Sequence, residues 1–165
     1  MNKTSRALLA AALLAVSGLA AATTVAVDAK ANSVSGGTAA DAFLLAAGDT
    51  FSISASGEWQ NDPNTAVYQS GPDGRASQTF TLAGTTFKTG SLVGEIASGP
   101  FFLVGSSFSG STAAGGELKL FYWDSDAFNN SGSVEAVITA VPEPMNFALM
   151  GLALGAFALT RRRKA

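Results

Sequence analysis

The 165-residue chain has no cysteine and no histidine, and it carries only ten basic and twelve acidic side chains. Without cysteine and histidine it cannot form a disulfide, a thiolate or imidazole metal site, a cysteine nucleophile or a Ser-His-Asp triad. Any metal ion that it binds must therefore be a hard cation that prefers oxygen ligands. A chain of this length has room for one domain of modest size in addition to terminal segments.

The basic residues are concentrated at the two ends of the chain. Lys3 and Arg6 lie near the start, and Arg161 to Lys164 lie near the end. Between residues 23 and 141 there are four basic side chains against eleven acidic ones, an excess of seven negative charges. An acidic middle region of this kind argues against nucleic acid as a partner.

The first 22 residues have the plan of a secretory signal peptide. The basic start is followed by an Ala/Leu run over residues 7–15 and by small residues up to Ala22. We predict cleavage after Ala22, because the segment TVAVDAKA that follows alternates as a strand does. A second Ala-x-Ala sequence at 29–31 is the alternative cleavage site. An uncleaved membrane anchor is a further alternative, although the apolar run is short for a membrane span.

The C-terminal segment combines a proline-rich tether, an apolar stretch and a basic tail. The apolar stretch covers residues 145–160 and is shorter than the ~20 residues that a transmembrane helix usually needs. A cluster of basic residues after such a stretch is expected to stay on the cytoplasmic side. The residues that define the tether and the tail are Val141, Pro142, Glu143, Pro144, Arg161, Arg162, Arg163 and Lys164.

In order and spacing these parts resemble the PEP-CTERM sorting signal of exported bacterial proteins. That resemblance implies transient insertion into the inner membrane and cleavage near the Pro-Glu-Pro motif by an exosortase. An ordinary C-terminal anchor that is never cut is the alternative. We therefore expect a signal peptide at 1–22, a folded domain at 23–140 and a sorting signal at 141–165, with the mature protein at the cell surface or outside the cell.

The middle region alternates between short apolar-polar runs and turn signals rich in Gly, Pro, Asn and Asp. In residues 51–56 the apolar side chains alternate with serines, and residues 117–122 and 133–139 show the same period of two. No window shows a convincing amphipathic helix of ten or more residues. Short strands at this spacing predict an all-β, antiparallel sandwich or barrel of about eight strands.

One loop concentrates oxygen ligands between two of the clearest predicted strands. Asp124, Asp126, Asn129 and Asn130 lie within seven residues of one another. Their carboxylate and amide oxygens, completed by backbone carbonyls and waters, suit Ca²⁺ better than Mg²⁺. The spacing is not that of an EF-hand. The alternative is a turn whose Asp and Asn side chains bond their own backbone.

Five short motifs in this order resemble the PA-I-like galactophilic lectin family over about residues 49–139. The resemblance implies a jelly-roll sandwich of the galactose-binding type, with one Ca²⁺ in the loop before the last strand and sugar hydroxyls completing its coordination. The motifs are Gly57-Glu58-Trp59, Leu92 to Ile96, Pro100 to Gly105, Gly116 to Leu120, and Asp124 with Asn129 to Ser133.

Carried over by motif, the resemblance implies Asp124, Asn129 and Asn130 as calcium ligands. Asp126 is a substitute for a threonine ligand that has no match here, in a loop about two residues shorter than in the galactose-binding members. An earlier loop contributes to sugar binding in the family, and its counterparts in this chain are Asn61, Asp62 and Tyr68. A histidine that contacts sugar in some members is missing, so galactose specificity does not follow.

The aromatic residues allow a sugar-stacking or a core interpretation. Trp59, Tyr68 and Trp123 have rings that can pack against the C–H face of a sugar or against other core side chains. If the strand continues through Trp123, Tyr122 and Trp123 point to opposite faces, so we expect at most one of them to face the core. We place Trp123 near the sugar site as a hypothesis. The phenylalanines at 101, 102 and 108 are expected in the core.

A glycosidase would need two carboxylates on either side of the scissile bond. The available glutamates show no pairing in the sequence, so we do not expect an enzyme; they are Glu58, Glu95, Glu117 and Glu135. The expected function is that of an exported, calcium-dependent protein that binds carbohydrate or exopolysaccharide at the cell surface or in the matrix. A structural matrix protein of the same fold, with a stabilising Ca²⁺ and no bound sugar, is the alternative.

Overall fold

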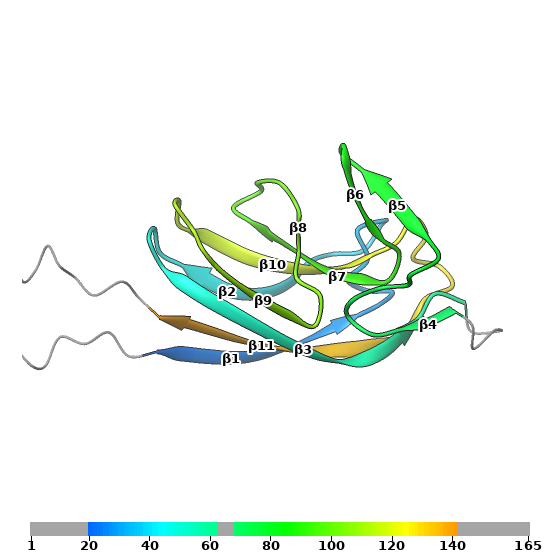
Figure 1. Cartoon of the computed structure of the whole chain (residues 1–165), viewed down its shortest axis with the longest axis horizontal. Coiled ribbons are helices and arrows are strands. Elements are labelled where there is room, and N and C mark those ends of the chain that lie inside the picture. The colour runs from blue at the N-terminus through cyan, green and yellow to red at the C-terminus, as the bar shows by residue number, and fades with distance from the viewer. Residues whose placement is uncertain (1–19, 63–67, 142–165) are drawn as a thin grey trace, which may run out of the picture. The chain divides into compact units, whose positions relative to one another are not determined.

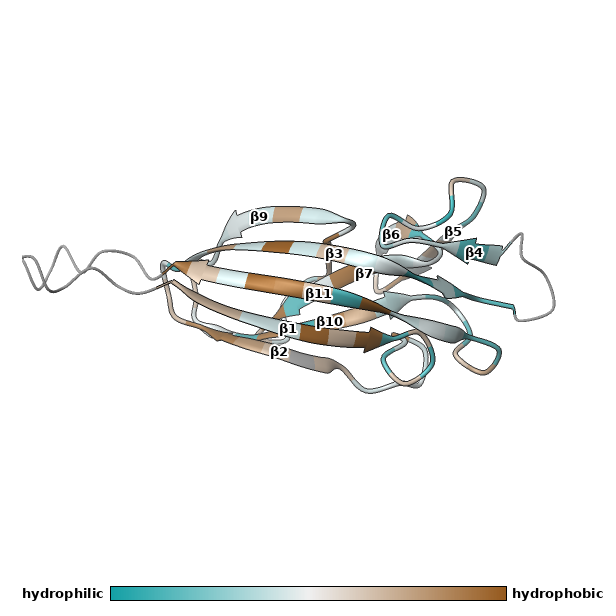
Figure 2. Ribbon diagram, turned by 90° about the horizontal axis from the view of Figure 1, so that it is seen from below, coloured by the Kyte–Doolittle hydropathy of each residue, from teal (hydrophilic) through white to brown (hydrophobic). Residues whose placement is uncertain are grey.

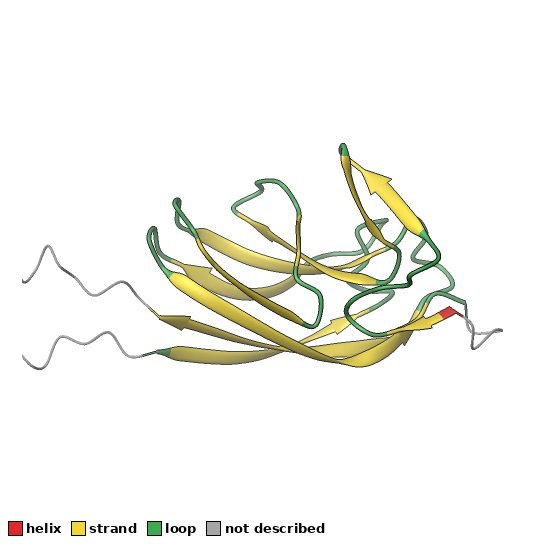
Figure 3. Cartoon of the chain, in the orientation of Figure 1, coloured by secondary structure: helices red, strands yellow, loops and turns green. Residues whose placement is uncertain are grey.

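The structure is a computed structural model and describes residues 20–62 and 68–141. Residues 1–19 of the predicted signal peptide (1–22) lie outside the described residues. The same holds for residues 142–165 of the predicted sorting signal (141–165). Strands joined by turns and loops dominate the described part (Figure 3). No helix in that part is long and apolar enough to cross a membrane. The strands are β1 (Ala21–Asp28), β2 (Ala40–Leu45), β3 (Thr50–Gln60), β4 (Gln69–Ser70), β5 (Thr79–Leu82), β6 (Thr85–Lys88), β7 (Ser91–Ile96), β8 (Phe102–Leu103), β9 (Ser107–Ser111), β10 (Gly116–Trp123) and β11 (Ser131–Val141).

Two antiparallel sheets form the two layers of a sandwich (Figure 1). The larger sheet has the strand order β1-β11-β3-β4, and β9 also pairs with β3. The second sheet has the order β2-β10-β7-β8, and β5 and β6 form a separate hairpin. The last strand, β11, thus lies between β1 and β3, so the two ends of the described chain meet in one sheet. Strand β1 pairs with β11 from Ala21 opposite Ala140 to Asp28 opposite Ser133.

The alternation predicted from the sequence sets the two faces of each long strand. In β3 the side chains of Phe51, Ile53 and Ala55 are buried, whereas the serines between them are exposed. Strand β11 buries every second residue from Val134 to Ala140 in the same way. Figure 2 shows this pattern as alternating hydropathy along the strands. The period-two rule for half-buried strands therefore accounts for which residues reach the core.

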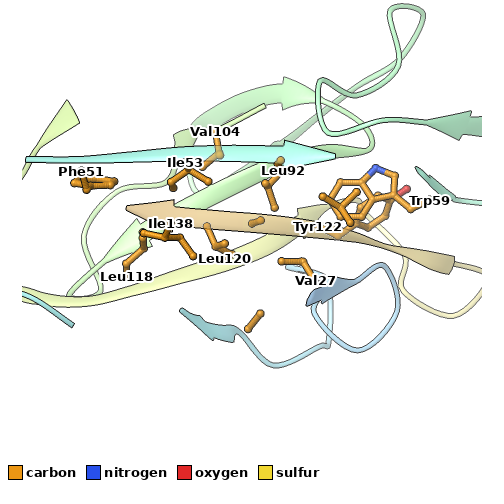
Figure 4. Close-up of a cluster of buried hydrophobic side chains, with 14 of the residues drawn as sticks. Val27, Phe51, Ile53, Trp59, Leu92, Val104, Leu118, Leu120, Tyr122 and Ile138 are labelled. Carbon is orange, nitrogen blue, oxygen red and sulfur yellow. The ribbon is translucent and has the colours of Figure 1, made fainter. Parts of the chain in front are cut away.

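The core fills the space between the sheets (Figure 4). Its largest members include Ile53, Leu120 and Ile138, each at most 1% exposed. At one end of the drawn cluster the rings of Trp59 and Tyr122 meet edge to face, with centroids 4.5 Å apart. The predicted all-β antiparallel sandwich is confirmed. Its described strands number eleven rather than about eight, because several are short pairings that leave no clear alternation in the sequence.

As expected, only one of Tyr122 and Trp123 belongs to the core between the sheets, but the other is buried as well. Both side chains are 0% exposed. Tyr122 belongs to the core between the sheets, whereas Trp123 packs in a second cluster against Phe80, Phe87 and Phe101. Its indole Nε1 donates a 2.9 Å hydrogen bond to the backbone carbonyl of Phe80. The β5–β6 hairpin covers the face of β10 that the alternation alone left open.

Candidate functional site

The loop between β10 and β11 crosses from one sheet to the other, since these strands belong to different sheets. Asp124 follows β10 directly, and Asn130 directly precedes β11. Their side chains are buried, with 4% of Asp124 and 5% of Asn130 exposed. Two of the four predicted calcium ligands are therefore held inside the protein by the ends of rigid strands.

Asp124 is a buried carboxylate whose negative charge is only partly compensated. Burial raises the pKa of Asp124, and the negative charge of Asp126 acts in the same direction. Hydrogen bonds from the backbone of Ser125 and from the side chain of Asn130 oppose this shift but leave the pKa raised. The bond from the Ser125 N–H to Oδ1 is 2.7 Å long. A bound cation would remove this cost of burying a charge.

Two more buried oxygens belong to the same end of the sandwich. The amide Oδ1 of Asn130 and the hydroxyl of Tyr122 have no hydrogen-bond partner among the described residues. The Asn130 Nδ2 group donates to the backbone carbonyl of Ala29 at 3.2 Å. Burial, and then the charge of Asp124, raise the pKa of Tyr122, whereas Arg75 lowers it. An unpaired buried polar group lowers the stability of the folded state by about 1–3 kcal/mol. A hydrogen bond from a water, or contact with a bound ligand, would remove this penalty for the two oxygens.

The predicted calcium ligands divide into two groups in this structure. Asp124 and Asn130 fit a Ca²⁺ site, because one offers a buried carboxylate and the other an unpaired buried amide oxygen. Asn129 and Asp126 are exposed. Asp126 Oδ1 accepts a 2.8 Å hydrogen bond from the backbone of Phe128, as in an ordinary Asx turn. Among residues 20–62 and 68–141 no three acidic side chains gather as a metal cluster. Any ion held here would depend on neutral oxygens as well as on Asp124.

Next to this loop lies an open, polar hollow of about 240 Å³. It unites residues from four separate parts of the chain: the end of β3, the residue before β4, the β4–β5 loop and the β10–β11 loop. The three residues for which the resemblance implied sugar contact all line it, together with one predicted calcium ligand. The lining residues are Asn61, Asp62, Tyr68, Arg75, Gln78 and Asn129.

Two of these lining residues, Arg75 and Gln78, were missed in the sequence. The Nη1 group of Arg75 donates to Asn61 Oδ1 at 3.2 Å and to Gln78 Oε1 at 2.7 Å. Its guanidinium carbon lies 4.4 Å from the centroid of the Tyr68 ring. A signal was available, because Arg75 is the one arginine of the chain outside its terminal segments.

The buried position of Trp123, which does not line the hollow, argues against a part for this residue in sugar binding. A stacking platform must expose a ring face, and Trp123 exposes none. Its ring contacts and its indole hydrogen bond hold the β5–β6 hairpin and Phe101 in place instead. Tyr68 is the aromatic residue that reaches the hollow.

The glutamates considered for glycoside hydrolysis are divided between the two sheets. Glu58 and Glu135 lie on β3 and β11, and Glu95 and Glu117 lie on β7 and β10. Glu117 forms an ion pair with Lys119 at 3.7 Å. The other three face solvent or are half-buried at separate strand positions. This arrangement does not favour a catalytic carboxylate pair.

No protein-family model matches the chain, and no curated protein matches it. Among solved structures, one described as "EclA N-terminal domain; PllA-like lectin" is similar, with a TM-score of 0.51 and 24% sequence identity. The match covers 72% of this chain and 94% of that one. The described part of the chain therefore has a lectin-like β-sandwich fold.

Proposed function

We propose that residues 23–140 form a lectin-like carbohydrate-binding domain of an exported protein, with its sugar site at the hollow beside the β10–β11 loop. One observation carries this proposal. The hollow joins Asn129, from the loop expected to hold Ca²⁺, with Asn61 and Tyr68, from the region expected to contact sugar. Amide groups and an aromatic ring are common means of binding a hydroxyl-rich ligand. The likeness in fold to a lectin domain supports the same interpretation.

We further propose that Asp124, Asn129 and Asn130 hold Ca²⁺ at this site. A bound Ca²⁺ supplies positive charge and open coordination positions that sugar hydroxyls can fill. Asp124 would provide the charged ligand. Its carboxylate is buried directly after the end of β10. The unpaired Oδ1 of Asn130 provides a neutral one. Asp126 stays in its turn and is left out of the proposed ligand set.

The test is retention of the protein on a panel of immobilised glycans in Ca²⁺ and in chelator. We expect retention in Ca²⁺ alone, and we expect Asp124→Ala to abolish it. Glu135→Gln is the matched control, because it removes one negative charge from the exposed face of β11. Equal retention of wild type in Ca²⁺ and in chelator would contradict the calcium proposal, and no retention on any glycan would contradict the lectin proposal.

A structural matrix protein is the second candidate function. One observation favours it: Asp124 and Asp126 each accept a backbone hydrogen bond within the loop, as the side chains of a self-contained turn do. In that case Ca²⁺ would raise the melting temperature of the protein while no glycan is retained. Melting and retention measured on the same sample therefore separate the two candidates.

Export and sorting complete the proposal. The signal peptide would deliver the chain across the membrane, and an exosortase would cut near Pro142 to Pro144 and release the protein to the cell surface or the matrix. The described strands lie between the two expected cleavage regions, since β1 begins at Ala21 and β11 ends at Val141. Cleavage after Ala22 would remove only the first two residues of β1, whereas cleavage after Ala31 would remove the whole strand.

A further inference from the structure

Arg75 is the basic residue that lines the hollow, where Asp62 is the acidic one, and the position of Arg75 is fixed from several sides. Its backbone N–H donates to the carbonyl of Thr89 at 2.8 Å. Its side chain is half-buried, bonds the amide oxygens of Asn61 and Gln78, and lies over the ring of Tyr68. An arginine held in this way has already lost much of its rotamer freedom before a ligand arrives.

The positive charge of Arg75 has no ion-pair partner within the described residues. The ion pair found there joins Lys119 to Glu117, two residues of β10. Among the described residues, the side-chain hydrogen bonds of Arg75 are made by Nη1, and both acceptors are neutral amides. The other guanidinium N–H groups make no hydrogen bond to residues 20–62 and 68–141, and this edge of the planar fork has the geometry that suits a ligand.

The edge of the guanidinium opposite Asn61 and Gln78 is best matched by an anionic group with two oxygens. A guanidinium binds a carboxylate or a sulfate with two parallel N–H···O bonds, which are shorter and stronger than bonds to a neutral hydroxyl. Neutral sugars need no such group. Because residues 23–141 carry an excess of seven negative charges, a polyanion gains nothing from the general field of the domain. A preference for anionic sugar would have to come from this one position.

We propose that Arg75 makes the hollow specific for acidic glycans, sugars that carry an anionic oxygen group such as a uronate carboxylate or a sulfate ester. This inference rests on the proposed sugar site. The anionic group binds the free edge of the Arg75 guanidinium, and Tyr68 presents the ring surface that remains beside it. Gln78 and Asn61 keep the guanidinium in place and act as positioning residues.

The experiment measures binding of the full-length protein, purified in detergent, to three immobilised polysaccharides in Ca²⁺: polygalacturonate, a sulfated galactan and a neutral galactan. Wild type should bind one or both acidic polymers at least ~10-fold more tightly than the neutral one, the effect expected of a charge-assisted hydrogen bond. The two acidic polymers identify the anion as carboxylate or sulfate. Arg75→Gln should remove the preference, and Arg75→Lys, which keeps the charge without the fork, should restore it in part.

Lys88→Gln is the matched control, because it removes one exposed positive charge that does not line this hollow. It should bind as wild type does. Equal loss in Lys88→Gln and Arg75→Gln, or an unchanged preference in Arg75→Gln, overturns the role of Arg75. Tighter binding to the neutral polymer overturns the acidic-glycan inference but leaves the lectin function standing. Binding to none of the three overturns the acidic-glycan inference, and retention on the glycan panel then decides the lectin function. Unchanged melting temperatures of the variants show that the fold is intact.

Discussion

The side-chain amide of Asn130 donates a 3.2 Å hydrogen bond to the backbone carbonyl of Ala29, 101 positions earlier in the chain. The bond links the loop of the candidate calcium site to the end of β1. In the same corner, the backbone N–H of Ala29 donates to the carbonyl of Gly132 at 3.0 Å. The first strand therefore supports the geometry of a loop that lies near the other end of the domain sequence.

Calcium should stabilise the protein through Asp124. Ion binding to the folded state alone adds roughly 2.7 kcal/mol at a hundredfold excess over the dissociation constant. Asp124→Ala should abolish the calcium-dependent rise in melting temperature, and Asn129→Ala and Asn130→Ala should reduce it. Asp62→Ala should change it little. Calorimetry in Ca²⁺ and in chelator measures all four, and a wild type that melts at one temperature in both would show that the loop is a structural turn.

The pH dependence of stability should carry the signature of Asp124. Burial raises its pKa in the folded state above the ordinary value near 3.9, so the folded state binds the proton more tightly than the unfolded chain. In chelator, this group's contribution to stability is most favourable below the ordinary pKa and declines as pH rises through the raised folded pKa. The negative charge of Asp126 also raises the pKa of Asp124. Asp124 in turn raises the pKa of Tyr122, which Arg75 lowers.

Melting of wild type and Asp124→Asn between about pH 3 and pH 8 measures this contribution. In chelator the melting temperature of Asp124→Asn should rise relative to that of wild type as pH increases, because the variant has no carboxylate to bury. In Ca²⁺ the order should reverse at neutral pH, since the ion binds the ionised carboxylate. Glu135→Gln again controls for the loss of one charge. If the melting temperature of wild type in chelator instead rose relative to that of Asp124→Asn as pH increased, the expected pH dependence would be contradicted.

The core should respond to truncation at the positions that the alternation places inside. Ile138 and Leu120 are fully buried, and replacing either with alanine removes several packed methyl groups. We expect a loss of about 2–5 kcal/mol in the free energy of unfolding for each. Glu135→Ala, on the exposed face of the same strand as Ile138, should change it by less than about 0.5 kcal/mol. Urea denaturation measures each difference.

Trp123 should matter for stability and not directly for sugar binding. Trp123→Ala should lower the free energy of unfolding by about 3–5 kcal/mol, because it removes a buried ring and leaves the Phe80 carbonyl without its donor. Phe128→Ala is the control, since that ring is 82% exposed. Denaturation measures the first effect. A Trp123→Phe variant that keeps its stability but loses all glycan retention would restore Trp123 to the sugar site.

Processing should remove both terminal segments in the native host. We expect a mature N-terminus near Thr23, which retains most of β1, and no residues beyond about Pro144. Intact-mass measurement of the secreted protein gives both ends at once. A secreted species that still contains Arg161 would contradict sorting by an exosortase. In a host without that enzyme the apolar tail should remain and keep the protein in the membrane fraction.

The inward and outward faces of the long strands could be predicted from the sequence alone. Alternation is a local property with a period of two residues. It therefore predicts that Phe51, Ile53 and Ala55 share one face of a strand, and that Val134, Ala136 and Ile138 share one face of another. The missing cysteine and histidine likewise restricted the chemistry without reference to structure. Both conclusions depend on residue type and near neighbours alone.

What covers each side chain, by contrast, depends on contacts between parts of the chain that are distant in sequence. The alternation places Trp123 opposite Tyr122, but it cannot reveal that the β5–β6 hairpin folds over Trp123. The loop sequence could not distinguish buried Asp124 and Asn130 from exposed Asp126 and Asn129, since burial depends on contacts with β1 and with the second sheet. The role of Arg75 was missed for a similar reason: its hydrogen bond to Asn61, 14 positions earlier, joins two loops that only the folded chain brings together.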